Sequence, residues 1–456
     1  MSTVRSRSAL VLVCVAAFLV YLDTSITPVA VPAIDAELAA GATAAQWLLD
    51  AYVLAFACLL LTAGALGDRF GRRSVLVAGV AGFTLASVAC ALAPDAGTLI
   101  AGRAAQGVFA AAVVPLSLAV AAGSAPDAAG RARAIGMWGG TCGVALALGP
   151  LLGGLLVETL GWRSIFWVNL PIGVLACVGL LRSVPAQAPA TGGRVDAVGQ
   201  VLFLVGGAGL TFALIEGPSL GWGSGVVLGL LAGGVVAWAL FAGWESRTAA
   251  PMLPPRLLVI PEVGLACAVN FLGLFGLYAA IYLVTVHLQT GLGFSPLETG
   301  VQFVALFGAL GVAAVLASRV VRQWGTRATM VAGLGCIAVG MAGLTLLAGG
   351  VGYAGYGWAL VLLGVGVPLS SGVVAIQAMM GAVPAELAAT ASGAMNTFRQ
   401  FGAVFGVALA GILSPVRDGV VTMMHVTFLA AGGAALAAAV LTAVVLRPVP
   451  DAASTR

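Results

Sequence analysis

Three charged residues lie inside the first four apolar stretches of the chain, where an isolated charge is unfavourable. Asp23 is in the first stretch, Asp50 is near the start of the second, and Arg103 is early in the fourth. An ionisable side chain inside a bilayer costs several kcal/mol unless it is paired or reached by water, so each is a functional candidate. A carboxyl group there can bind and release a proton, and a nearby guanidinium changes how tightly the proton is held.

The elements that must position these residues are visible as long apolar runs. Apolar residues make up 61% of the 456 residues and charged residues only 8%, which is far from the composition of a soluble domain. Inside a bilayer the backbone has to satisfy its own hydrogen bonds, so runs of about 20 apolar residues indicate spanning helices. We expect fourteen: 9–31, 46–66, 74–93, 97–121, 134–157, 163–181, 197–216, 224–244, 262–287, 297–317, 328–348, 355–379, 391–413 and 424–446.

Helix geometry places the three charged side chains at a similar depth. Asp23 lies roughly 21 Å from the inner start of its helix, and Arg103 lies roughly 9 Å from the outer start of its own in a core about 30 Å thick. Asp50 is slightly shallower, so two acids and one base at one level could compensate one another. The alternative for Asp23 and Arg103 is a static ion pair that locks the helices. For Asp50 it is a place in the interfacial belt beside Trp47.

Basic residues predict the orientation of the chain. There is no lysine, and all 20 basic residues are arginines. With the N-terminus in the cytoplasm, 16 of them fall in inside loops or tails, Arg163 and Arg417 fall outside, and Arg103 and Arg399 lie within spans. This asymmetry predicts cytoplasmic N- and C-termini. The first apolar run contains no small-residue cleavage site, which indicates a retained helix rather than a signal peptide.

Two connections are longer than the others and divide the expected helices into three groups. Residues 182–196 and 245–261 are rich in proline and separate six spans, two spans and six spans, as semi-rigid spacers do. The predicted domains are an N-terminal six-helix bundle over 1–184, two additional spans with a cytoplasmic linker over 185–247, and a C-terminal six-helix bundle over 248–456.

An internal echo supports this division. The loops at 64–73 and 317–327 each place arginines around a late glycine, at matching positions in the two halves. Such an echo indicates a duplicated bundle, with the two copies facing one another around a midplane site.

Composition excludes several classes of protein. The seven cysteines are scattered through apolar runs and the two histidines are far apart, which argues against disulfides and metal sites. A chain without lysine cannot form the phosphate-binding loop of an ATPase, and no nucleophile–base spacing or catalytic acid pair indicates an enzyme. No basic patch indicates nucleic acid. Small-residue stripes are attributed to packing within one chain, so we expect a monomer. No cofactor is expected.

Three segments resemble signatures of the major facilitator superfamily. Residues 67–73 read Gly-Asp-Arg-Phe-Gly-Arg-Arg, residues 103–107 read Arg-Ala-Ala-Gln-Gly, and residues 149–154 read Gly-Pro-Leu-Leu-Gly-Gly. Three more, at 22–32, 162–173 and 396–402, are similar to the fourteen-span drug:proton antiporter branch of that family.

The resemblance implies an all-α polytopic membrane fold and several roles. It implies a conformational-switch loop, for which a positive-inside anchor is the alternative, and a hinge in the fifth span, for which an ordinary kinked helix is the alternative. Three further candidates are less specific: Gln106 in the fourth span, Glu216 at the outer end of the seventh, and Arg399 within the thirteenth, whose partner the sequence does not identify. The loop comprises Gly67, Asp68, Arg69, Gly71, Arg72 and Arg73, and the hinge comprises Gly149, Pro150, Gly153 and Gly154.

The expected function is proton-coupled export of small amphipathic or antibiotic-like molecules across a bacterial cell (inner) membrane. The alternatives are a proton-coupled uptake symporter for a metabolite and a non-transporting receptor or scaffold, which would be expected to carry a sizeable soluble domain. Pro28, Ala145 and Asp50 stand where family members usually have Asn, Gly, and Thr or Asn. These departures concern the substrate and the coupling, not the fold.

Overall fold

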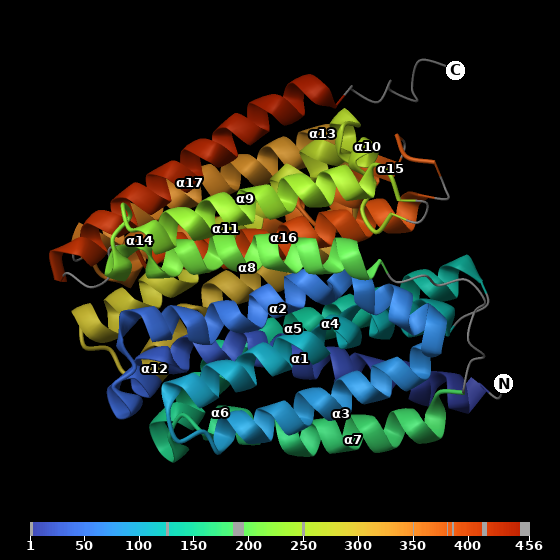
Figure 1. The fold of residues 1–456 in the computed structure, drawn as a ribbon, viewed down its shortest axis with the longest axis horizontal. Coiled ribbons are helices and arrows are strands. Elements are labelled where there is room, and N and C mark those ends of the chain that lie inside the picture. Colours follow the sequence, from blue (N-terminus) through green and yellow to red (C-terminus); the bar gives the residue numbers. More distant parts are fainter. Residues whose placement is uncertain are drawn as a thin grey trace.

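The computed structural model describes residues 3–124, 127–185, 196–248, 251–349, 351–380, 382–384, 387–412 and 417–446. Every regular element in these ranges is a helix, and the long helices run side by side in one bundle (Figure 1). Twelve helical segments of the described residues are long and apolar enough to cross a membrane, against the fourteen predicted. The expected all-α polytopic architecture is therefore confirmed, whereas the predicted number of spans is not reached by this criterion.

In the first group, helices pack both on their neighbours in sequence and on helices further along the chain. The second helix packs on the fourth, the first on the fifth, and the third on both the fourth and the seventh. This group consists of α1 (Thr3–Leu38), α2 (Gly41–Phe70), α3 (Arg72–Ala91), α4 (Ala96–Gly123), α5 (Ala128–Leu160), α6 (Ser164–Trp167) and α7 (Asn169–Ser183).

The remaining helices form a central pair and a second group. The central pair lies across the boundary between the two groups, where α8 contacts both α2 and α16 (Figure 1). The pair is α8 (Ala197–Leu220) and α9 (Gly225–Glu245). The second group is α10 (Pro255–Leu258), α11 (Pro261–Val286), η1 (His287–Gly291), α12 (Pro296–Gln302), α13 (Val304–Leu344), η2 (Thr345–Gly349), α14 (Tyr353–Ser370), α15 (Val373–Met380), α16 (Ala388–Ala410) and α17 (Arg417–Val445).

The molecule has two distinct ends. α1 begins and α17 ends at the same end of the bundle, which we call the terminal end (Figure 1). The opposite end, called the turn end, carries the short connection between α1 and α2 at residues 39–40.

The internal echo in the sequence has a counterpart in the backbone. Gly71 separates α2 from α3 with φ 87°, and Gly325 interrupts the helical geometry of α13 with φ 76°. A Cβ added to Gly107 of α4 would overlap the carbonyl oxygen of Tyr52, and a Cβ added to Gly364 of α14 would overlap that of Leu306. Each half thus repeats a glycine break and a glycine contact. Residues 186–195, which make up most of the predicted connection at 182–196, lie outside the described residues.

The break at Gly71 gives a first testable prediction. Its φ lies in the region that L side chains rarely adopt, so Gly71→Ala should destabilise the fold by about 1–3 kcal/mol and lower the melting temperature in detergent. Gly64→Ala is the matched control, since Gly64 is helical and a Cβ there meets nothing within 4 Å. Equal melting temperatures for the two variants would contradict the argument.

Candidate functional site

The carboxyl group of Asp23 is the centre of a buried polar network. It is completely inaccessible to solvent on α1, and it accepts hydrogen bonds from three side chains. Arg103 Nη1 of α4 lies 2.5 Å from Oδ2, while Gln106 Nε2 and Asn169 Nδ2 lie 3.1 Å and 2.8 Å from Oδ1. The structure therefore brings together Asp23, Arg103 and Gln106 as an ion pair with an added amide. A buried ion pair is tolerated when its remaining polar atoms are satisfied in this way.

Arg103 connects this pair to a third helix. Its Nε donates to the carbonyl oxygen of Leu48 on α2 at 3.0 Å, and its guanidinium lies 4.4 Å from the ring centroid of Tyr52 on the same helix. Nη1 also donates to Gln106 Oε1 at 2.9 Å. A change in the charge of Asp23 would consequently reach α2 as well as α1 and α4.

Asn169 at the start of α7 completes the network, although the sequence assigned it no role. Its Nδ2 also contacts Ser87 Oγ at 2.9 Å, and Ser87 donates to the carbonyl oxygen of Phe166 at 3.0 Å. Asn169 belongs to a segment that carried the family resemblance, which was the available signal. Because its side chain is uncharged, the cost of burying a charge does not single it out.

Asp50 does not join this network, so the prediction that it helps to compensate Arg103 is wrong. Asp50 is fully buried on α2, and neither carboxyl oxygen has a hydrogen-bond partner among the described residues. Helix geometry explains the difference, because residues two positions apart point about 200° apart around the axis. Leu48 and Tyr52 lie beside Arg103, and Asp50 between them points away. Equal depth did not mean the same face.

Asp50 shares its face of α2 with Gln46, which bonds to the second group of helices. Gln46 Nε2 lies 3.1 Å from the carbonyl oxygen of Ala408 on α16, and Gln289 Nε2 of η1 lies 3.1 Å from that of Val29 on α1. Both hydrogen bonds are near the turn end. These hydrogen bonds hold the first and second groups of helices together at the turn end.

The predicted hinge in α5 also contributes to this closure. A Cβ at Gly149 would overlap the side chain of Ser25, and Gly153 likewise packs against α1. Gly154 faces α12 of the second group, where an added Cβ would lie within 3 Å of its backbone. The helix continues through Pro150. The structure thus explains why these positions are small, and their role as a hinge stays a prediction.

The predicted switch loop lies between α2 and α3. Asp68 Oδ1 pairs with Arg72 Nη2 at 3.0 Å, and Arg73 Nη2 donates to the carbonyl oxygen of Leu181 on α7 at 2.5 Å. Its switching role stays a prediction. The other predicted members are Gly67, packed against Leu116 of α4, Arg69, over the ring of Phe70, and Gly71, between the two helices.

Arg399 on α16 has a partner that the sequence could not identify. Its guanidinium lies close enough to Tyr21 on α1 and Tyr278 on α11 to interact with both electrostatically. Its buried Nε has no hydrogen-bond partner, and none of the three ion pairs in the described part of the chain includes it.

Glu216 forms a hydrogen bond between the central pair of helices and the first group. Trp47 Nε1 of α2 donates to Glu216 Oε1 of α8 at 3.1 Å. Near the other end of α8, Gln200 bonds to Thr62 and to the carbonyl oxygen of Cys58, both on α2. The half-buried Glu216 is therefore a structural contact as well as a boundary charge.

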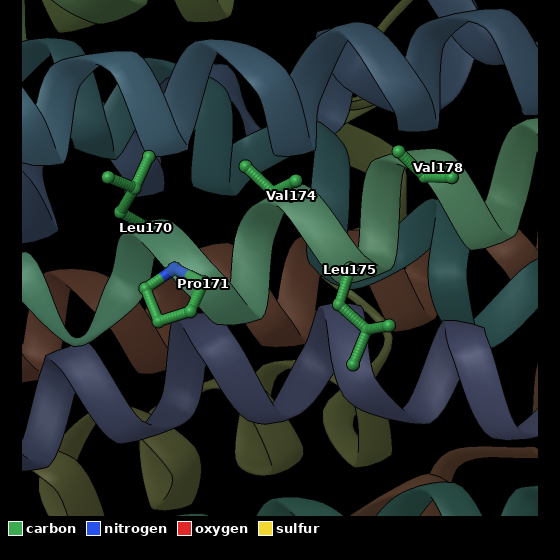
Figure 2. Close-up of a pocket in the computed structure, with 5 residues that line it drawn as sticks. All are labelled: Leu170, Pro171, Val174, Leu175 and Val178. Atoms are coloured by element: carbon green, nitrogen blue, oxygen red, sulfur yellow. The ribbon is translucent and has the colours of Figure 1, made fainter.

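An apolar groove on α7 is unrelated to this site. Figure 2 shows its lining side chains along one exposed face of the helix, with no charged group among them. Such a face is suited to lipid rather than to proton transfer. The lining residues are Leu170, Pro171, Val174, Leu175 and Val178.

Solved structures support the fold independently. The bundle is similar to the POT family transporter PepTSo, with a TM-score of 0.68, 15% identity, and coverage of 96% of this chain and 97% of that one. It is also similar to a D-xylose-proton symporter, with a TM-score of 0.68, 17% identity, and coverage of 95% of this chain and 96% of that one. At these identities the likeness is one of fold.

Sequence relatives are closer. The multidrug resistance protein Stp of Mycobacterium tuberculosis is 37% identical over 402 residues, which cover 86% of this chain and 73% of the relative. The tetracenomycin C resistance and export protein of Streptomyces glaucescens is 34% identical over 91% of this chain and 77% of the relative. The cephamycin export protein of Amycolatopsis lactamdurans is 38% identical over 89% of this chain and 85% of the relative.

A family model matches nearly all of the bundle, from residue 13 to residue 407. The match includes the Asp23 network, the loop around Gly71 and the glycines of α5. It agrees with the motifs, the paired helices and the relatives. The chain is a multi-pass membrane transporter that belongs to the Major Facilitator Superfamily.

Proposed function

We propose that this protein is a proton-coupled exporter of small amphipathic molecules of the multidrug or antibiotic type, acting by alternating access. The observation that carries the proposal is the fully buried Asp23–Arg103 pair, a carboxyl group held beside a cation inside a membrane transporter. The direction of transport comes from the relatives, which are named for drug resistance and for export.

In the proposed cycle, a proton and Arg103 compete for Asp23. When Asp23 is ionised it holds Arg103, which in turn holds the Leu48 carbonyl of α2. Protonation removes the charge that Arg103 pairs with and so releases this restraint on α2. Because Gln46 on the same helix bonds to α16, the change extends to the closure at the turn end. The paired arrangement corresponds to the state that has already given up its proton.

Asp50 is proposed as a second, separate proton-coupling residue. An ionised carboxyl group without a partner costs several kcal/mol when buried, so Asp50 in this arrangement is suited to carrying a proton. Its position on the same face as Gln46 would expose it to water when α2 and α16 separate. Asp50 therefore lies on the face of α2 that points away from the Asp23–Arg103 pair.

The topology that we propose has fourteen spans. α13 contains 41 residues, and at about 1.5 Å per residue it would be about 60 Å long, roughly twice the thickness of the bilayer core. The break at Gly325 supports counting α13 as two spans and not one. α16, with 23 residues, is a further span, which brings the twelve candidates to fourteen. The domains are then 1–184, 185–247 and 248–456.

The proposed location is the bacterial cell membrane, with cytoplasmic termini and the turn end outside. The arginine asymmetry of the sequence supports this orientation, and the relatives come from bacteria. Substrate, protons and lipid are the proposed partners of a monomer that needs no cofactor.

Everted membrane vesicles with an acidic interior test the proposed direction. An exporter should accumulate an amphipathic dye in these vesicles and release protons from them at the same time. Collapse of the pH gradient with an ionophore should stop both. Accumulation only in right-side-out vesicles would instead support uptake, and no transport in either orientation would support a receptor.

A further inference from the structure

We propose that Arg399, together with the hydroxyl groups of Tyr21 and Tyr278, binds an acidic group of the substrate, so that the transporter prefers amphipathic anions to neutral molecules of the same shape. This inference rests on the proposed export function and adds the substrate class. It concerns residues outside the Asp23 network.

The charge of Arg399 has no acidic counterpart in the described part of the chain. The carboxyl group of Asp23 is occupied by three donors, and none of the ion pairs between described residues includes Asp50 or Arg399. A guanidinium within a membrane-spanning bundle costs several kcal/mol unless a counter-charge or water compensates it. A bound anion would supply that counter-charge.

The position of Arg399 between the two groups of helices suits a substrate site. The guanidinium on α16 acts on Tyr21 of α1, Cys142 of α5 and Tyr278 of α11. Midplane sites in such transporters lie between the two bundles, where one ligand can contact both. Arg399 and Tyr278 come from the second group, while Tyr21 and Cys142 come from the first.

The hydrogen-bonding capacity at this point exceeds what the protein itself uses. The Nε atom of Arg399 is buried and has no acceptor among the residues that the structure describes. A guanidinium presents its donors in a planar fork that matches a carboxylate, and a tyrosine hydroxyl can donate to the same group. Trp138 packs edge-on against Tyr21 at a centroid distance of 6.1 Å, which provides an apolar surface for the rest of an amphipathic ligand.

This site lies close to the proton-binding network. Tyr21 is two residues before Asp23 on α1, and Tyr278 interacts electrostatically with both Arg103 and Arg399. A substrate anion at Arg399 would therefore change the electrostatic field at the ion pair. Exchange of substrate for proton needs such a connection between the two sites.

Equilibrium binding to the purified full-length protein in detergent tests the inference. The probes are anthracenecarboxylate and naphthalenecarboxylate, each paired with its carboxamide, and fluorescence anisotropy gives the dissociation constants at pH 7.5. Wild type should bind each carboxylate about tenfold or more tightly than its carboxamide, the size expected for hydrogen bonds to a charged group. Arg399→Gln should bring the two constants together by weakening carboxylate binding alone.

Two further variants keep the test informative if Arg399→Gln folds poorly. Arg399→Lys retains the charge without the fork and should keep part of the preference, and Tyr21→Phe should reduce it a few-fold. Equal binding of acid and amide by wild type, absence of binding by every probe, or an unchanged preference in Arg399→Gln would overturn the inference. Because the assay needs no gradient, a carboxylate preference together with absent transport in vesicles would reject the export function alone.

Discussion

Asp23→Asn is expected to lower proton-driven export in everted vesicles by about 100-fold or more, because the asparagine side chain cannot carry the exchanged proton. The substitution keeps the size of the side chain and an oxygen that can accept from Gln106 and Asn169. The variant should therefore fold. Substrate-for-substrate exchange, which needs no proton, should persist.

A matched control is available on the same helix. Asp35 lies near the turn end of α1, where it accepts a hydrogen bond from the backbone nitrogen of Gly41 at 2.7 Å. Asp35→Asn changes the same charge outside the network and should transport at the wild-type rate. Wild-type proton-driven export by Asp23→Asn would remove Asp23 from the mechanism, and the coupling role would then pass to Asp50.

Arg103→Leu is expected to have the largest effect on stability. It leaves the buried carboxylate of Asp23 without its counter-ion, which typically destabilises a protein by about 3–5 kcal/mol. It also removes the donor to the carbonyl oxygen of Leu48. The melting temperature in detergent at pH 7.5 should fall well below that of wild type, and export should be lost.

The double variant Asp23→Asn/Arg103→Gln separates stability from coupling. It replaces the ion pair with two neutral amides that can hydrogen-bond to each other, so it should recover most of the lost stability. Proton-driven export should stay absent. If the double variant were no more stable than Arg103→Leu, the ion pair would not be the reason for the loss.

The sequence predicts the depth of Asp23 and Arg103 in the bilayer. Their depths in the bilayer follow from the rise of a helix and the length of each apolar run, and those depths matched. Depth alone does not tell which way a side chain points. Asp50 matches Arg103 in depth, but it lies on the opposite side of α2 from Leu48 and does not contact Arg103.

Other contacts required the packed structure. The hydrogen bond from Arg103 to the carbonyl oxygen of Leu48 involves a backbone atom, which no residue type reveals. The partner of Arg399 is a hydroxyl group on a helix about 380 positions earlier in the chain. The bonds of Gln46 to α16 likewise depend on how the two groups of helices meet.

The sequence by itself determined that the chain forms membrane-spanning helices, because the polar backbone of a long apolar run must satisfy its hydrogen bonds within the run when it crosses a bilayer. It also indicated the loops at 64–73 and 317–327, where the structure places Gly71 and Gly325 in a backbone geometry that glycine readily adopts. The tertiary structure alone decided which faces meet, because the rotation of each helix is set by packing against its neighbours. That rotation joins Asn169 to Asp23, leaves Asp50 without a hydrogen-bond partner among the described residues and brings Arg399 near Tyr21.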